Sequence, residues 1–250
     1  MNPIRTAGRL WLALALAACG PARPAPTPAA PLPTMVPLPQ VETLADLFPA
    51  APRLGAPPAA WTWRALDVGQ LEVPTGELLV SDLFFAGLDA PLARQVPAGR
   101  YTVTLSLLSQ PGSGFEDVAA ARLQIRPQPP VAWETARFLP ANGEPGADGY
   151  AVDSGMAAFS TPPSAAALTQ RLDRDPTYVD AIIEQSAANE LEGSWALIRP
   201  DPALAANVAG FGSGWGDGVY AAYWGLDAGG APVCLVTEFQ LISVAQLPPP

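Results

Sequence analysis

The chain contains no histidine and no lysine, since all 13 of its basic residues are arginines. These absences exclude a Ser-His-Asp triad, a zinc site with histidine ligands, a lysine Schiff base and a P-loop lysine. Any catalysis would have to depend on carboxylates, with or without a divalent metal ion.

Cysteine is nearly as scarce, with Cys19 and Cys234 as the two examples. Cys19 is predicted below to carry a lipid, which leaves no partner for an intrachain disulfide. Cys234 lies in the apolar run 233–236, which is typical of a buried strand. We therefore expect an inert core thiol rather than a reactive one.

The N-terminus carries the features of a removable secretion signal. Arg5 and Arg9 precede an apolar run at 10–16, which is too short to cross a bilayer, and small residues lead directly to Cys19. This cleavage pattern resembles the bacterial lipobox, in which the cysteine receives the lipid. We expect residues 1–18 to be a signal peptide and the mature protein to be anchored to a membrane through Cys19, on its extracytoplasmic side. The alternative is an ordinary secretory signal with a chance cysteine.

Proline and alanine dominate residues 19–60, which predicts an extended, disordered tether. Residues 61–247 then form one globular domain of ordinary size. On this interpretation, a chain that begins near residue 61 would fold as stably as the mature protein.

The formal net charge of the chain is −10, and loss of Arg5 and Arg9 with the signal would leave −12. Phosphate binding needs basic patches, and none is visible in the sequence. Nucleic acid is therefore not an expected partner.

The pattern of the domain predicts an α+β fold, mainly antiparallel β in a sandwich-like or curved sheet, with a helical insertion around 162–189. Segments rich in β-branched or aromatic residues, separated by proline and glycine, predict strands. They are 61–68, 77–81, 101–108, 118–125 and 131–138. Two further strands, 219–226 and 232–243, are joined by a hairpin turn at 227–230.

Two helices are expected within the insertion. One begins with Asp175 as its N-cap and Pro176 in the first helical position, and its apolar residues share one face. A shorter helix precedes it at 162–172.

Glycine alternates with other residues from Gly210 to Gly218. The spacing does not match a nucleotide-binding loop. An extended strand would place every glycine on one face, smooth enough for a close approach by a ring, a backbone or a ligand. The alternative is a bulged or tightly curved strand that packs on the core of the domain itself.

Several short motifs occur together in one order along the chain. They are 79–82 (LVSD), 97–103 (PAGRYTV), 118–123 (VAAARL), 133–134 (WE), 152–155 (VDSG) and 217–220 (DGVY). In this combination the chain resembles the bacterial domain-of-unknown-function family 4241, from about residue 76 to 242. The resemblance implies a shared fold and carries no known activity. In the family, the segment that corresponds to 152–155 usually contains Asp-Ala-Gly, whereas this chain has Asp-Ser-Gly, with Ser154 in the middle position.

Asp82, Asp153 and Asp217 each lie at or beside the end of a predicted strand, next to small residues. If they converge, they could bind calcium or magnesium, or two of them could act as general acid and base. Each can also be a simple turn cap. Tyr220 and Trp224 could line a sugar or peptide groove, although aromatic residues on strands are more often core.

Two classes of function remain. The first is a non-catalytic binding or interaction domain at the cell envelope, with a protein or a glycan as its partner and no cofactor. The second is a hydrolase that depends on carboxylates, with calcium or magnesium as a candidate cofactor. Glu134 and Arg137 receive no catalytic role, because a regular strand would place them on opposite faces.

Overall fold

The computed structural model describes residues 38–55, 61–110, 112, 114–140, 146–189 and 195–248. These residues all belong to one compact unit, Val36–Pro250. The predicted signal peptide, Cys19 and residues 19–37 and 56–60 of the predicted tether lie outside the described residues. Within the described part, no helix is both long enough and apolar enough to span a membrane.

The larger sheet has seven strands, and every neighbouring pair is antiparallel. In spatial order they are β2 (Arg53–Leu54), β3 (Thr62–Val73), β5 (Gly99–Ser109), β6 (Glu116–Gln124), β14 (Pro232–Glu238), β13 (Ala222–Leu226) and β7 (Ala132–Thr135). The register shifts within three of these pairs, for example where β3 passes Gly69. Such bulges increase the local twist, and the sheet curls accordingly.

A second, four-stranded antiparallel sheet packs against the first. Its order is β10 (Trp195–Ile198), β11 (Val208–Gly212), β9 (Met156–Ser160) and β4 (Leu79–Asp82). Two small pairs complete the β structure. An antiparallel ribbon joins β8 (Tyr150–Val152) to β12 (Gly218–Tyr220), and a parallel pair joins β1 (Gln40–Val41) to β15 (Ser243–Val244).

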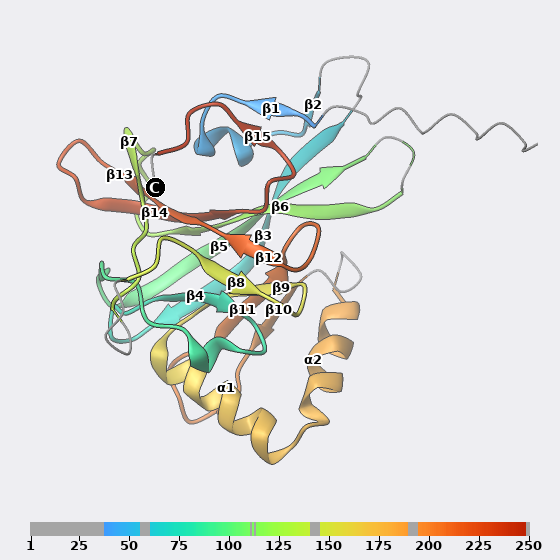
Figure 1. The fold of residues 1–250 in the computed structure, drawn as a ribbon, viewed down its shortest axis with the longest axis vertical. Helices are drawn as coiled ribbons and strands as arrows, with labels where there is room; N and C mark the ends of the chain where they lie inside the picture. The colour runs from blue at the N-terminus through green and yellow to red at the C-terminus, as the bar shows by residue number, and fades with distance from the viewer. Residues whose placement is uncertain are drawn as a thin grey trace, which may run out of the picture. The chain divides into compact units, whose positions relative to one another are not determined.

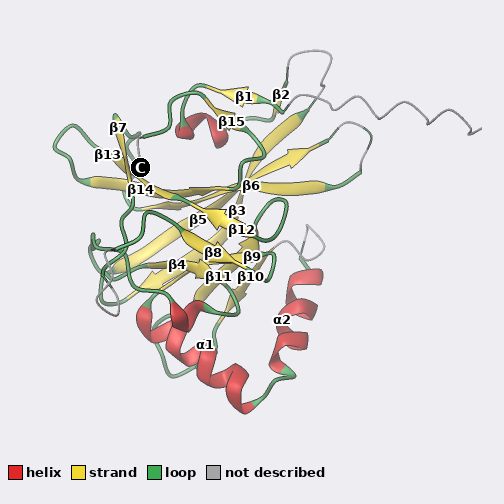
Figure 2. Cartoon of the chain, in the orientation of Figure 1, coloured by secondary structure: helices red, strands yellow, loops and turns green. Residues whose placement is uncertain are grey.

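The seven-stranded sheet and the four-stranded sheet are each covered on both faces, so the unit has four layers. The main core lies between the sheets, where Leu105 and Trp224 of the large sheet meet Phe159 and Phe211 of the small one. A second core covers the outer face of the large sheet, and a third lies under the helices. Figure 1 shows this arrangement, with the helices at one end and β1 and β15 at the other, and Figure 2 shows the strands between them.

The helical insertion consists of α1 (Pro162–Arg174) and α2 (Tyr178–Ala187). Thr161 caps α1 by accepting a hydrogen bond from the Ser164 amide. The insertion and the antiparallel β architecture confirm the predicted fold class. The predicted cap was wrong, however, because Asp175 ends α1 and Thr177 precedes α2. The Asp175 carboxylate instead accepts a hydrogen bond from the Thr177 hydroxyl at 2.6 Å.

The predicted boundary at residue 61 lies too far along the chain. Leu44 and Leu47, in the 3₁₀ helix η1 (Leu44–Leu47), are fully buried on the outer face of the large sheet. The Ser106 hydroxyl donates to the Leu47 carbonyl, and the Trp63 indole to the Asp46 carbonyl. Residues 40–54 therefore belong to the folded unit, because the large sheet has an apolar outer face that needs a cover.

The glycine-rich segment is not one extended strand. β11 ends at Gly212, and β12 begins at Gly218 and pairs with a different sheet. Between them Gly214 and Gly216 have positive φ values of 62° and 102°. A Cβ on Gly214 would lie 2.9 Å from that of Phe239, so this turn needs glycine for both conformation and space. The predicted strand 219–226 is likewise divided between β12 and β13.

We expect Leu44→Ala to lower the free energy of unfolding by about 2–5 kcal/mol, because it removes a fully buried side chain from the second core. Leu54→Ala is the matched control, since Leu54 is 69% exposed and should change stability by less than about 0.5 kcal/mol. Urea unfolding of both variants measures the difference. Equal, small effects would mean that residues 40–54 do not pack as described.

Candidate functional site

Asp82 lies at the end of β4 and is only 3% exposed, yet its carboxylate has no cationic partner among the described residues. It accepts five hydrogen bonds instead. Oδ1 receives the amides of Phe84 at 2.8 Å and Phe85 at 3.3 Å. Oδ2 receives the amides of Asp153 and Ser154, both at 2.8 Å. The Ser154 hydroxyl adds a fifth bond to Oδ1.

This arrangement assigns Asp82 a structural role. Its carboxylate caps its own turn and also holds the turn between β8 and β9, 71 residues further along the chain. These five donors satisfy the acceptor positions of both carboxylate oxygens. Ser154, the departure from the family pattern, supplies two of these donors, its amide and its hydroxyl.

Asp153 and Asp217 meet at the same end of the β8–β12 ribbon. Asp153 follows Val152 and Asp217 precedes Gly218, and those two neighbours are paired across the ribbon. Both aspartates are exposed, whereas Asp82 is buried beneath them. Within the described part of the chain, no group of three or more acidic, cysteine or histidine side chains is arranged to hold a metal ion.

The predicted aromatic residues have different environments. Tyr220 is 6% exposed, and its hydroxyl donates to the carbonyls of Ser213 and Gly216, so it braces the glycine-rich turn. Trp224 is 1% exposed and belongs to the main core, but it also lines the floor of a surface groove.

A half-buried acid that sequence reasoning missed lies near Asp82. Burial, followed by repulsion from Asp82, raises the pKa of Asp89 to about 6. Asp89 lines a 330 Å³ hollow between η2 (Ala86–Leu88) and α1, beside Thr169 and Gln170. Little in the sequence selects Asp89 as a site residue, because a single aspartate before an alanine and a proline is typical of an ordinary turn.

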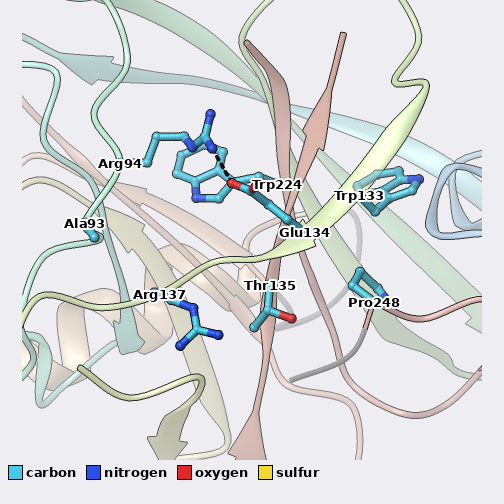
Figure 3. A pocket seen from close by; sticks show the side chains of 8 residues that line it. All are labelled: Ala93, Arg94, Trp133, Glu134, Thr135, Arg137, Trp224 and Pro248. Atoms are coloured by element: carbon cyan, nitrogen blue, oxygen red, sulfur yellow. Dashed lines mark hydrogen bonds and ion pairs between the residues drawn. The ribbon is translucent and has the colours of Figure 1, made fainter. Parts of the chain in front are cut away.

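A groove of 570 Å³ lies along β7, and we call it the β7 groove. It is lined by Ala93, Arg94, Trp133, Glu134, Thr135, Arg137, Trp224 and Pro248. Arg94 is ion-paired with Glu134 and also donates to the Gly230 carbonyl at 3.0 Å. In the view of Figure 3, the Trp224 indole lies behind this pair and Arg137 points away from it. Arg137 pairs with Asp148 at 3.4 Å, whereas Glu134 pairs with Arg94.

Trp133 is shared by the β7 groove and two neighbouring hollows. It lines the β7 groove and two further hollows of 360 Å³ each, which lie toward Ala45 and Pro130. A Cβ on Gly225 would lie 3.1 Å from the Trp133 ring, so the indole rests against bare backbone. The Trp-Glu dipeptide was visible in the sequence, but the hollows around it are built by residues from both ends of the domain.

The fold and the groove define an antiparallel β domain with a surface hollow at the edge strand of its larger sheet. The profile of one protein family, described as "Protein of unknown function (DUF4241)", matches residues 71–237. The match covers more than half of the chain, and the chain therefore belongs to this family, as its motifs predicted. No curated protein matches the chain, and neither does any solved structure.

We expect Asp82→Asn to lower the free energy of unfolding by about 1.5–3 kcal/mol, because the amide replaces a charged acceptor and turns an NH₂ group toward N–H donors. Asp217→Asn, at an exposed position, should change it by less than about 0.5 kcal/mol. Urea unfolding at neutral pH compares the two. A larger loss in Asp217→Asn, or a calcium isotherm that this variant abolishes, would instead favour a metal site.

Proposed function

We propose that this protein is a non-catalytic binding domain, anchored to the extracytoplasmic side of a membrane by a lipid on Cys19, and that it binds an envelope or extracellular partner around Trp133. The observation that carries the binding site is the position of Trp133, which borders three hollows at one end of the large sheet. A partly exposed indole among polar side chains suits the recognition of a protein or a glycan.

The alternative, a hydrolase that depends on carboxylates, has less support. Such an enzyme needs two acids that face one substrate with different protonation states. Asp82 is occupied by five hydrogen bonds from the protein, and Asp153 and Asp217 lie on the surface. In the β7 groove, Glu134 is held by Arg94. Asp89 lines a hollow and has a pKa raised into the range useful for acid catalysis, but none of the other described residues that line that hollow is an acid.

The membrane anchor is supported by the sequence from Arg5 to Cys19 and by the proline-rich run that follows. A semi-rigid spacer would hold the domain away from the lipid surface, where its partner can reach it. Anchoring is independent of the binding site, and the two parts of the proposal are tested separately.

For the anchor, Cys19→Ala should release the protein from the membrane fraction or leave an uncleaved precursor. Fractionation and mass spectrometry of the N-terminus measure this outcome. If the variant is processed normally and stays in the membrane fraction, the protein is not a lipoprotein.

For the binding site, Trp133→Ala should abolish capture of the partner from envelope extract or from a glycan array. Trp215→Ala is the matched control, because Trp215 is 67% exposed and lies away from the three hollows. Capture that survives Trp133→Ala, or that Trp215→Ala removes equally, would contradict the assignment. Circular dichroism of both variants checks that they are folded.

A further inference from the structure

One of the two 360 Å³ hollows beside Trp133 is lined by a partly buried cation, Arg122. We call this hollow the Arg122 cavity. It lies between Phe48 of the N-terminal segment and the proline-rich turn 127–130, and its other lining residues include Gln124, Gln128, Trp133 and Cys234. Arg122 extends into this region from β6, on the outer face of the large sheet.

Arg122 differs from the other described arginines. Eight of the ten lie within ion-pairing distance of a carboxylate, and Arg174 donates to the Gln170 amide. Arg122 has neither kind of contact in the described part of the chain, and its Nε is buried without a hydrogen-bond partner. The charge of the Asp67 carboxylate acts on Arg122, but no described carboxylate lies within ion-pairing distance of it, so the desolvation of this partly buried guanidinium is only partly offset.

An aromatic contact supplies part of the missing stabilisation. The Arg122 Cζ lies 4.5 Å from the centroid of the Phe48 ring, a cation–π distance. Such a contact stabilises the positive charge, but the ring accepts no conventional hydrogen bond from the five N–H groups of the guanidinium. Burial lowers the pKa of Arg122, although an arginine side chain remains charged at neutral pH. Its hydrogen-bonding capacity is therefore available to a bound anion.

The rest of the cavity determines which anion would fit. None of the described residues that line it is an acid, and Phe48, Trp133 and the prolines supply the apolar part of its walls. Burial raises the pKa of the Cys234 thiol to about 11, so this group is neutral. A dianion such as phosphate would need a second cation, and among the described lining residues Arg122 alone is cationic. A carboxylate matches a guanidinium with two parallel hydrogen bonds.

We propose that the Arg122 cavity binds a monocarboxylate with a flat apolar body, with its carboxylate on Arg122 and its body between Phe48, Trp133 and the proline-rich turn. This inference rests on the proposed function in that Trp133 borders both the cavity and the β7 groove. The proposal for the Arg122 cavity adds a class of ligand to the proposed function. This class is an aromatic or unsaturated carboxylic acid, or a peptide C-terminus that carries such a group. Benzoate is its simplest probe.

The test is calorimetric titration of benzoate into the full-length chain. We expect saturable binding that weakens about tenfold or more in Arg122→Gln, because a charge-assisted pair is lost. Arg174→Gln, the control at the other arginine without a carboxylate, should bind benzoate like the parent. Benzamide, which has the same shape and no charge, and inorganic phosphate should bind at least about tenfold more weakly than benzoate.

The proposal is overturned if benzoate does not bind at millimolar concentration, if benzamide binds equally well, or if Arg122→Gln binds benzoate unchanged. Should Arg122→Gln fail to fold, NMR of the parent protein decides the question. Contacts from benzoate protons to the Phe48 and Trp133 rings support the site, and contacts elsewhere overturn it. Failure with benzoate leaves the capture experiment on Trp133 untouched, so the two proposals fail separately.

Discussion

A single buried carboxylate connects the end of β4 to the turn between β8 and β9. Asp82 ends β4, and its five hydrogen bonds reach the turn that leads into β9. That turn then holds the next one, because the Gly155 carbonyl accepts the Ser213 amide at 3.1 Å and so positions the glycine-rich turn before β12. Tyr220 closes the same turn from the other side. A group that could have been a catalytic acid thus serves as a connection between loops, and this is one reason that we propose binding rather than hydrolysis.

Burial of both faces of both sheets explains most of the remaining architecture. A curled antiparallel sheet with two apolar faces needs a cover on each, and the main core fills only one side. The helices cover the smaller sheet, while the N-terminal segment and the residues after β14 cover the larger one. The hollows around Trp133 form where this second cover meets the edge strand β7, so the candidate site depends on residues from both ends of the domain.

Local chemistry made much of the fold predictable. The turn at Asp227 was recognised because aspartate and glycine satisfy a hairpin, and its carboxylate accepts the Gly229 and Ala231 amides at 2.9 Å. Long-range packing was not predictable. Leu44 lies in a proline-rich sequence, and its burial depends on its contacts with the sheet beneath it. Three of the five hydrogen bonds to Asp82 come from residues 71 and 72 positions further along the chain, and the Arg122 Nε has no hydrogen-bond partner among the described residues. No local sequence pattern reveals either feature.

The central claim, that Asp82 is a structural anchor for the turn after β8, can be measured directly by amide hydrogen exchange. The account predicts slow exchange for the amides of Asp153 and Ser154 in the parent protein, although Asp153 lies at an exposed position, and fast exchange in Asp82→Asn. The amide of exposed Asp217 provides the reference within the same molecule. Exchange at Asp153 and Ser154 that is already as fast as at Asp217 in the parent protein would contradict the account.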